Sequence, residues 1–499
     1  MVNRFSIFLC FLLAGYTISA QTTIAAKVID TDSKDPIPFL TVKYAEGKGV
    51  VTNEEGDFSI TINEDIKETD SIQLSYMGYG KKSFAIKGFN LSTIELKEEA
   101  LELATVFVTD KKLPPEEIIE RVKNNLTRNY KGGYTKNKFF LRESYSQYYK
   151  QFDFGFKKSS IKELNKELID SIANSIPKRM AYYNETLGNL YTQNFNSQQK
   201  LNIIKGSKLF NKDLNLSFEA LNKKLMDIMN KNIKRDSYLK IRSGIIGTKV
   251  EVDSIVNDVK EAEKKAKENP HEHFHDQRTK TLRYLLGNLF YEEDSEMNML
   301  HKSHKYEFEL LDYAEVNDDL AYVISYRSKN GNGFNGKMYV NTDDFAVLRI
   351  DYASSKNIYD KKFNMFGINA NHINFEGSMH FSKHDENKYY TLQYLQHRNL
   401  DSFKLDRPLA VIEKNKHVKG KRKQNELKLQ MLFNLINRST YDLVIFNSEE
   451  VNNDVVNNIT ENKKVEVKHF SKYNPDFWKG YNIIEPNKAI RSFTAEEQL

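Results

Sequence analysis

Residues 50–86 hold four short apolar runs separated by turn residues, and this pattern constrains the fold more than any other feature of the chain. Within residues 58–62 the apolar side chains alternate with Ser and Thr, so one face of a strand is directed into a core. Residues 72–76 repeat that alternation. Between the first two runs stands NEEG at 53–56, and Asn and Gly tolerate the positive φ of a tight hairpin. The stretch therefore predicts a domain built from short β-strands.

Four motifs lie in and before this stretch: IAAKVID at 24–30, DPIP at 35–38, TNEEGDF at 52–58 and LSYMGY at 74–79. They resemble the G-x-V-x-D, G-x-P-L-P, T-D-x-x-G-x-F and x-S-Y-x-G-Y motifs of the carboxypeptidase-regulatory-like domain. Ala26 and Asp35 stand where that family has glycine, so these two turns are expected to be built differently. The resemblance implies a seven-strand, transthyretin-like β-sandwich over residues 21–97, which in this family is a non-catalytic module of secreted and envelope proteins.

Residues 1–20 have the pattern of a secretory signal peptide. Arg4 supplies the positive charge, residues 7–14 form an apolar run too short to span a membrane, and small residues precede the expected cleavage site after Ala20. Cys10 is the only cysteine and lacks the small neighbours of a lipoprotein signal, so no lipid anchor is expected. The mature chain would then contain no disulfide and no thiolate site. We expect an exported protein, periplasmic or associated with the outer membrane.

The composition argues against nucleic acid as a partner. Charged residues make up 28% of the chain, but the net charge is only +6, so no strong positive field exists to attract phosphates. No later stretch of the sequence reaches the roughly 18 apolar residues of a membrane-spanning helix, so the mature chain is expected to have no transmembrane span. The many tyrosines and phenylalanines, 28 and 31, favour sheet over helical bundle.

The sequence from 98 to 300 divides into a linker and a longer mixed region. Residues 98–113 form a charged linker, and their β-like run at 105–109 resembles the segment that follows the same sandwich in TonB-linked outer-membrane receptors, where it can pair with TonB. The sequence after it does not resemble a receptor plug, so a plain edge strand is the favoured interpretation. Residues 114–300 are predicted to be a mixed, largely helical region, whose first helix opens at Pro114-Pro115.

From residue 306 the apolar residues recur with a period of two. Strands are predicted at 306–311, 320–327, 335–340, 345–352, 371–382, 388–397, 441–447 and 464–469. Residues 301–499 are thus predicted to form an antiparallel meander with a C-terminal tail. The strands from 306 to 397 also resemble the half-open sheets of envelope lipoprotein-carrier proteins. The predicted fold class is mainly β: an N-terminal sandwich followed by an α+β domain with a curved antiparallel sheet and helical insertions.

One motif suggests zinc chemistry. HEHFH at 271–275 satisfies HExxH, in which two histidines on one helical face hold zinc and the glutamate polarises a bound water. Glu293 lies near the position where a third ligand falls in one branch of such enzymes. The sequence from 264 to 280 is polar, however, whereas the helix of a zinc peptidase is embedded in apolar residues. We therefore expect a solvated loop, and the alternative is a zinc-dependent hydrolase centred on His271, Glu272 and His275.

The remaining candidates are weaker. His304 and Glu307 match the H-x-x-E pair of zinc carboxypeptidases, but Glu307 lies on the polar face of a predicted strand and is expected to face water. GNGFNG at 331–336 has the glycine spacing of a nucleotide-binding loop, yet it joins two predicted strands, so a turn is expected. The aromatic residues that offer stacking faces for sugar rings are Tyr148, Tyr149, Phe152, Tyr182, Tyr183, Tyr389, Tyr390 and Trp478.

The sequence as a whole resembles exported proteins of Bacteroidetes type that carry a carboxypeptidase-like regulatory domain. It predicts a non-enzymatic binding or scaffolding component of the cell envelope, with no catalytic residue, no cofactor and no metal. The expected partner is an envelope protein or a glycan. Two alternatives stay open, the zinc hydrolase at 271–275 and a glycan-binding component of nutrient uptake, and the sequence does not fix the oligomeric state.

Overall fold

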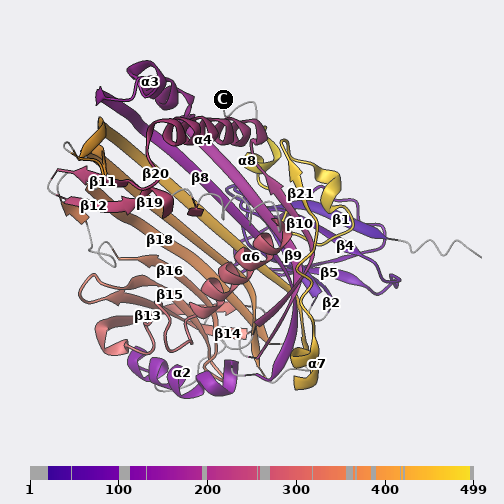
Figure 1. Cartoon of the computed structure of the whole chain (residues 1–499). Coiled ribbons are helices and arrows are strands. Elements are labelled where there is room, and N and C mark those ends of the chain that lie inside the picture. Colours follow the sequence, from indigo (N-terminus) through magenta and orange to yellow (C-terminus); the bar gives the residue numbers. More distant parts are fainter. Residues whose placement is uncertain are drawn as a thin grey trace, which may run out of the picture. The chain divides into compact units, whose positions relative to one another are not determined.

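The computed structural model describes residues 21–494, apart from 46–47, 100–112, 131, 194–198, 245, 255–256, 259–269, 317–318, 356–362, 366–367, 384–388, 416 and 420–421. The chain is mostly β, as predicted, and divides into two compact units (Figure 1). The first comprises residues up to Ala100 together with Pro475–Lys488, and the second comprises residues 101–474 and 489–499.

The first unit contains the predicted β-sandwich. Its strands are β1 (Thr22–Asp30), β2 (Thr41–Ala45), β3 (Lys48–Val51), β4 (Asp57–Ile62), β5 (Ser71–Ser75), β6 (Lys82–Ala85) and β7 (Thr93–Leu96). They form one sheet in the order β4-β1-β7 and another in the order β3-β2-β5-β6. The alternating residues Val28, Ile60 and Leu74 are fully buried, which is why the period-two pattern predicted these strands.

The hairpin before β4 depends on a glycine. Gly56 has a φ of +77°, and a Cβ at this position would lie 2.3 Å from the carbonyl oxygen of Val28. Asn53 stabilises the same turn, since its Oδ1 accepts hydrogen bonds from the amides of Glu55 and Asp57, each at 2.9 Å. The NEEG turn predicted from the sequence is therefore built by the residues that predicted it.

The C-terminal tail belongs to the first unit, although the sequence placed it in the region 301–499. The short helix η3 (Pro475–Trp478) ends on the only tryptophan of the chain, whose side chain is 3% exposed. Further along, Asn482 accepts a hydrogen bond from the amide of Thr61 at 2.7 Å and donates one to its carbonyl at 3.2 Å. The tail thus occupies hydrogen-bonding groups of the edge strand β4, a pairing more than 400 residues apart in sequence that no local pattern indicates.

The second unit is organised around one large sheet. Its order is β13 (Tyr306–Val316), β14 (Asp319–Ser328), β15 (Phe334–Asn341), β16 (Val347–Ser354), β18 (Ile368–Lys383), β19 (Tyr390–Lys414), β20 (Lys423–Glu450), β8 (Tyr134–Ser159), β9 (Arg179–Gln193), β10 (Gln199–Leu209) and β21 (Val467–Phe470). The neighbours pair antiparallel except β10 and β21, which are parallel. β11 (Tyr238–Ser243) joins β19 and β12 (Ile246–Glu251), and β17 (Phe363–Met365) pairs with β18.

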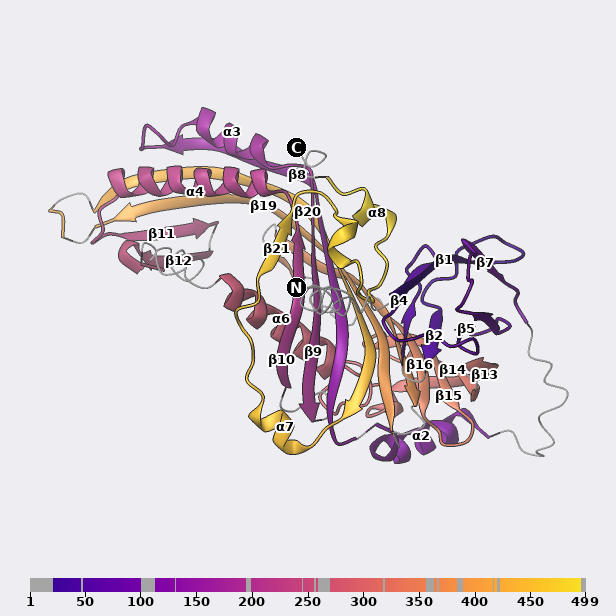
Figure 2. The same cartoon turned by 90° about the vertical axis from the view of Figure 1, so that its right-hand side faces the viewer.

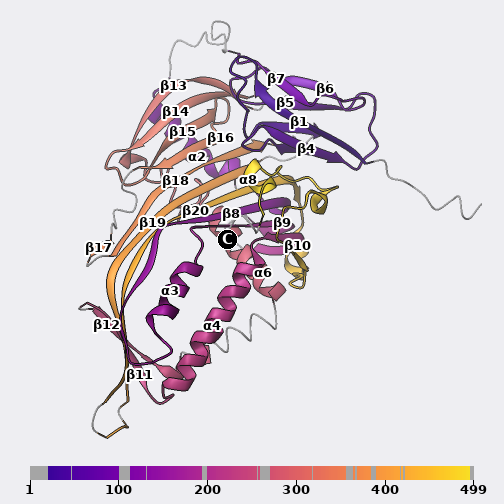
Figure 3. The same cartoon turned by 90° about the horizontal axis from the view of Figure 1, so that it is seen from above.

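The boundary expected at residue 300 does not separate two units, because β8 pairs with β20 along most of its length. Three register shifts, at Lys428/Leu429, Asn434/Leu435 and Ile445/Asn447, interrupt that pairing. Extra residues of this kind bend a strand and increase its twist. Figures 2 and 3 show β8, β19 and β20 curving out of the body of the sheet toward α4 (Lys212–Asn232) and β11.

The helices of the second unit lie around the sheet. Besides α4 they are α2 (Pro115–Tyr130), α3 (Lys166–Ser175), α6 (Pro270–Gly287), η2 (Ser303–Lys305), α7 (Asn453–Asn458) and α8 (Lys488–Arg491), of which α8 begins at the last residue of the first unit. α6 crosses one face of the sheet (Figure 1) and buries Phe274, Leu282 and Leu286 there. Among the helices of the described residues, none has both the length and the apolar character of a membrane-spanning helix.

Candidate ligand-binding pocket

One residue from each of several neighbouring strands forms a row on the sheet face that α6 covers. Each member of the row is the register partner of the next, in the order from β14 to β20: Tyr326, Gly336, Tyr352, Gly377, His397 and Tyr441. Partners in register point to the same face of a sheet. The two glycines are required sterically, since a Cβ would lie 1.9 Å from Asp351 O at Gly336 and 2.1 Å from Gln396 O at Gly377.

The glycines let tyrosine rings reach across the neighbouring strand. Tyr326, in register with Gly336, donates to the carbonyl of Asp351 at 2.9 Å. Tyr352, in register with Gly377, brings its hydroxyl to 2.9 Å from Nδ1 of His397. The backbone of the strands therefore holds His397 and Tyr352 in position without a ligand.

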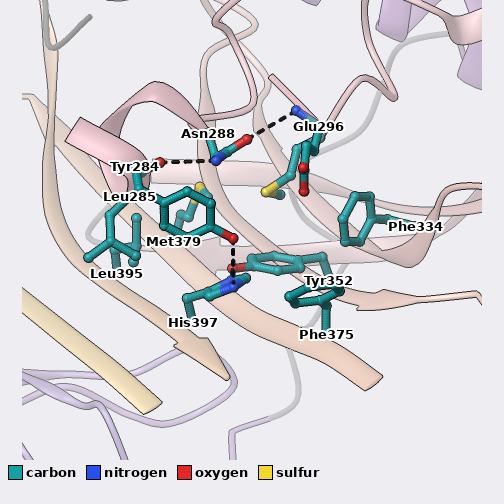
Figure 4. Close-up of a pocket in the computed structure, with 11 residues that line it drawn as sticks. Tyr284, Leu285, Asn288, Glu296, Phe334, Tyr352, Phe375, Met379, Leu395 and His397 are labelled. Atoms are coloured by element: carbon teal, nitrogen blue, oxygen red, sulfur yellow. Dashed lines mark hydrogen bonds between the residues drawn. The ribbon is translucent and has the colours of Figure 1, made fainter. Parts of the chain in front are cut away.

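A pocket of about 340 Å³, part of it open to solvent, lies between this row and α6 (Figure 4). Its lining comes from four strands, from α6 and from the loop after α6: Phe334, Tyr352, Phe375, Met379, Leu395, His397, Tyr284, Leu285, Asn288, Glu296 and Met297. Most of these side chains are apolar or aromatic and buried. A concave, mainly apolar cavity with a few polar groups is the usual form of a small-molecule site.

His397 is the polar centre of the pocket wall. Its Nε2 lies 3.4 Å from the hydroxyl of Tyr284, and the ring of Phe375 stacks on it with centroids 5.5 Å apart. Burial lowers the pKa of His397 to about 4. The imidazole is therefore neutral at physiological pH, with one nitrogen available to donate and the other to accept.

The tyrosines beside His397 are also uncharged. Burial, followed by the carboxylate of Glu296, raises the pKa of Tyr284 to about 12, and burial raises the pKa of Tyr352 as well. None of these three side chains changes its charge between pH 6 and pH 9. The arrangement offers hydrogen bonds and aromatic faces, which suits binding better than proton transfer.

A buried ion pair holds α6 on the sheet next to the pocket. Arg278 of α6 contacts Glu143 of β8, and the two side chains are 4% and 0% exposed. Thr281 and Tyr145 each donate a hydrogen bond to Oε1 of Glu143 at 3.1 Å. Burial raises the pKa of Glu143, an effect that the positive charge of Arg278 opposes. Since Tyr284 lies on the same helix, this pair also fixes the position of the pocket wall.

The solvated loop expected at 264–280 is wrong where the structure describes it, because residues from Pro270 onward are helical. Phe274 and His275 are 1% and 2% exposed. The apolar stripe that buries this helix continues through Leu282 and Leu286, beyond the polar segment on which the expectation was based.

The HExxH motif therefore lies on the helix α6. The side chains of His271 and Glu272 lie outside the described residues. Nε2 of His275 lies 2.9 Å from the carbonyl of Leu201, to which it donates. Among the described residues, no three His, Asp or Glu side chains are grouped as a metal site, and Glu293 is exposed.

The other predicted residues do not converge. His304 and Glu307 are exposed, and Glu307 lies 3.8 Å from Arg327. GNGFNG forms the expected turn between β14 and β15, in which Gly331 has a φ of +67°. Two of the aromatic candidates for sugar stacking are buried, Trp478 in the first unit and Tyr390 in the second. Five others lie on the paired strands β8 and β9, where Tyr182 is exposed against Tyr145: Tyr148, Tyr149, Phe152, Tyr182 and Tyr183.

A serine and a histidine also meet on the opposite face of the sheet. Ser378 donates to Oδ1 of Asp351 at 2.7 Å and lies 2.8 Å from Nε2 of His380. Because the serine proton is directed to Asp351, His380 must donate to the serine oxygen, which is the reverse of a general base. Arg349 holds both oxygens of Asp351, at 2.9 and 3.0 Å. This group is a structural network and not an activated nucleophile.

Sequence reasoning missed the pocket residues. They come from four strands, from α6 and from the loop after it. The strands themselves were predicted, but which side chains share one face depends on the register between strands. The available signal was the pair of glycines at 336 and 377, each inside a predicted strand, where glycine marks a close approach by a neighbouring group.

Comparisons with known proteins identify one part of the chain. No curated protein matches the sequence. Among solved structures, a putative outer membrane lipoprotein-sorting protein domain from Vibrio parahaemolyticus is 9% identical, with 69% of this chain and 97% of that one covered, at a TM-score of 0.23. A chain of the Pseudomonas aeruginosa MucA/MucB complex is 6% identical, with 65% of this chain and 93% of that one covered, at a TM-score of 0.17. At such scores neither likeness carries a conclusion about this chain. Residues 24–108, which include the strands β2 to β7 of the first unit, match the family model of the CarboxypepD_reg-like domain, so the chain carries a domain of that family.

Proposed function

We propose that this chain is an exported, non-catalytic envelope protein whose large sheet binds a small ligand with an apolar body in the pocket beside α6. The observation that carries the proposal is the pocket lining, in which Phe334, Met379 and Leu395 are 3%, 1% and 1% exposed. Burial of apolar ligand surface against such walls drives binding.

The polar groups of the pocket support binding over catalysis. His397 is held between the hydroxyls of Tyr284 and Tyr352, and its pKa of about 4 keeps it neutral. A neutral imidazole whose two nitrogens already face tyrosine hydroxyls is a poor base at neutral pH. The zinc-hydrolase alternative is less well supported, because Nε2 of His275 already donates to Leu201. The glycan alternative is also less well supported, because the aromatic candidates Trp478 and Tyr390 are buried.

The envelope setting rests on other features of the chain. The pattern of residues 1–20 supports export with cleavage after Ala20. The CarboxypepD_reg-like domain supports a place among envelope proteins, with a second envelope component as the partner of the first unit. We extend this to a periplasmic or outer-membrane-associated location and to an origin in a bacterium of Bacteroidetes type.

Removal of the Tyr284 side chain should weaken ligand binding. A neutral naphthylamine dye, which fluoresces in apolar surroundings, is expected to bind the full chain saturably, and Tyr284→Ala to bind it roughly fivefold more weakly, since one aromatic wall and its contact with His397 are lost. Fluorescence titration gives both affinities. Tyr148→Ala is the matched control, because Tyr148 and Tyr284 are 40% and 41% exposed but Tyr148 lies outside the pocket. Non-saturable binding, or equal losses in both variants, would contradict the proposal.

A further inference from the structure

The loop after α6 carries an acidic side chain to the mouth of the pocket. Asn288 fixes that loop, because its Oδ1 accepts from the amide of Glu296 at 3.1 Å and its Nδ2 donates to the carbonyl of Tyr284 at 3.0 Å. Glu296 itself is exposed and lines the pocket. Figure 4 shows its carboxylate directed into the space between Asn288 and Phe334.

Glu296 sets the charge of the pocket. Among the eleven lining residues it is the one with a formal charge at neutral pH, because the pKa of His397 is about 4 and that of Tyr284 about 12. The charged groups that act on Tyr284 are Glu296 and Asp401, both acidic, and they add to the effect of burial in raising its pKa. A ligand head in this pocket therefore meets a negative potential.

Aromatic rings lie below the same mouth. Phe334 meets Tyr352 edge to face with centroids 5.6 Å apart, and the ring of Tyr352 lies nearly parallel to that of His397 at 6.1 Å. The face of an aromatic ring attracts cations through its quadrupole, and a nearby carboxylate adds to that attraction. An ammonium head fits this combination, whereas an anionic head would be repelled by Glu296 and would find no positively charged lining residue.

We infer that the pocket selects amphiphilic ammonium compounds, with the apolar chain against Leu285, Met379 and Leu395 and the charged nitrogen between Glu296 and the rings of Phe334 and Tyr352. This inference rests on the proposed function, since it names the ligand class of the same pocket. The apolar walls supply the affinity, and Glu296 with the aromatic rings supplies the preference for positive charge.

Three probes with one decyl chain separate these contributions: decyltrimethylammonium, decanol and decyl sulfate, each titrated calorimetrically below its micellar concentration. The full chain is expected to bind the ammonium about tenfold more tightly than the alcohol, and the sulfate least tightly. Glu296→Gln is expected to lower ammonium affinity about fivefold and leave alcohol affinity unchanged. Glu293→Gln is the matched control, because Glu293 is exposed on the same loop but does not line the pocket.

The outcomes distinguish the charge preference of the pocket from its binding of apolar ligands. Equal affinities for ammonium and alcohol, tightest binding of the sulfate, or an unchanged ammonium affinity in Glu296→Gln would overturn the charge preference while leaving apolar ligand binding intact. Failure of all three probes to bind would overturn the proposed function itself, and the charge preference with it.

Discussion

Replacing Arg278 with alanine is expected to lower the free energy of unfolding by about 3–5 kcal/mol, because it leaves the carboxylate of Glu143 buried without its cation. Glu143 is 0% exposed, and two hydrogen bonds from Thr281 and Tyr145 do not replace a full charge. Urea denaturation of the full chain measures the loss. Arg283→Ala is the control, since Arg283 lies on the same helix but is exposed. This substitution should change the free energy of unfolding by no more than about 0.5 kcal/mol.

The same variant should depend on pH in a defined direction. Burial already raises the pKa of Glu143, and removal of Arg278, whose charge opposes that shift, raises it further. A carboxyl whose pKa is higher in the folded than in the unfolded state binds protons on folding, so its contribution to stability falls as pH rises from the unfolded pKa through the folded one. The loss in Arg278→Ala is therefore expected to be smaller at pH 5 than at pH 8.

Two results would contradict this account of α6. One is a loss below about 1 kcal/mol, and the other is a loss that grows on acidification. A paired variant adds a further check: Arg278→Met combined with Glu143→Gln removes both charges and is expected to be more stable than Arg278→Ala alone.

Trp478→Ala should destabilise the first unit by about 3–5 kcal/mol, since it deletes a large side chain that is 3% exposed and packs against Phe477 and Tyr481. Hydrogen exchange of the full chain localises the effect, because the amide of Thr61 in β4 donates to Asn482 of the tail and should exchange faster in the variant. The Tyr481 side chain is 38% exposed, so Tyr481→Ala should change the free energy of unfolding and the exchange rate of the Thr61 amide far less. Unaltered exchange of Thr61 in Trp478→Ala would show that the tail does not support β4.

The first unit was predictable because its signals are local. Strands such as β4 alternate in sequence, and the turn at Gly56 uses residue types that tolerate its geometry. The docking of the tail was not predictable, because Asn482 and Thr61 are joined by contacts that only the tertiary fold creates. Residues 22–97 expressed by themselves would lack these contacts.

In the second unit, too, local patterns were predictable and long-range contacts were not. The strands from 306 to 397 and the end of β20 at 441–447 were visible from their period-two pattern, whereas the remainder of β19 and most of β20 were not predicted. The pairing of β8 with β20 brings together segments almost 300 residues apart. α6 was mistaken for a loop because its first turns, HEHFHDQRTK, are polar and its buried stripe becomes apolar only further along. The pocket depends both on the pairing of distant strands and on the packing of α6, so no sequence pattern pointed to Tyr284 or His397.

Methionine-methyl NMR of the full chain tests the pocket most directly. Met297 and Met379 line the cavity. Met226 and Met229 of α4 lie outside the pocket and pack against Leu239 of β11. Titration with the neutral naphthylamine dye should shift the methyl signals of Met297 and Met379 through the ring current of the bound dye and leave those of Met226 and Met229 unchanged. Saturable shifts confined to the α4 methionines, or no shift at Met297 and Met379 when the dye is bound, would contradict a ligand site beside α6.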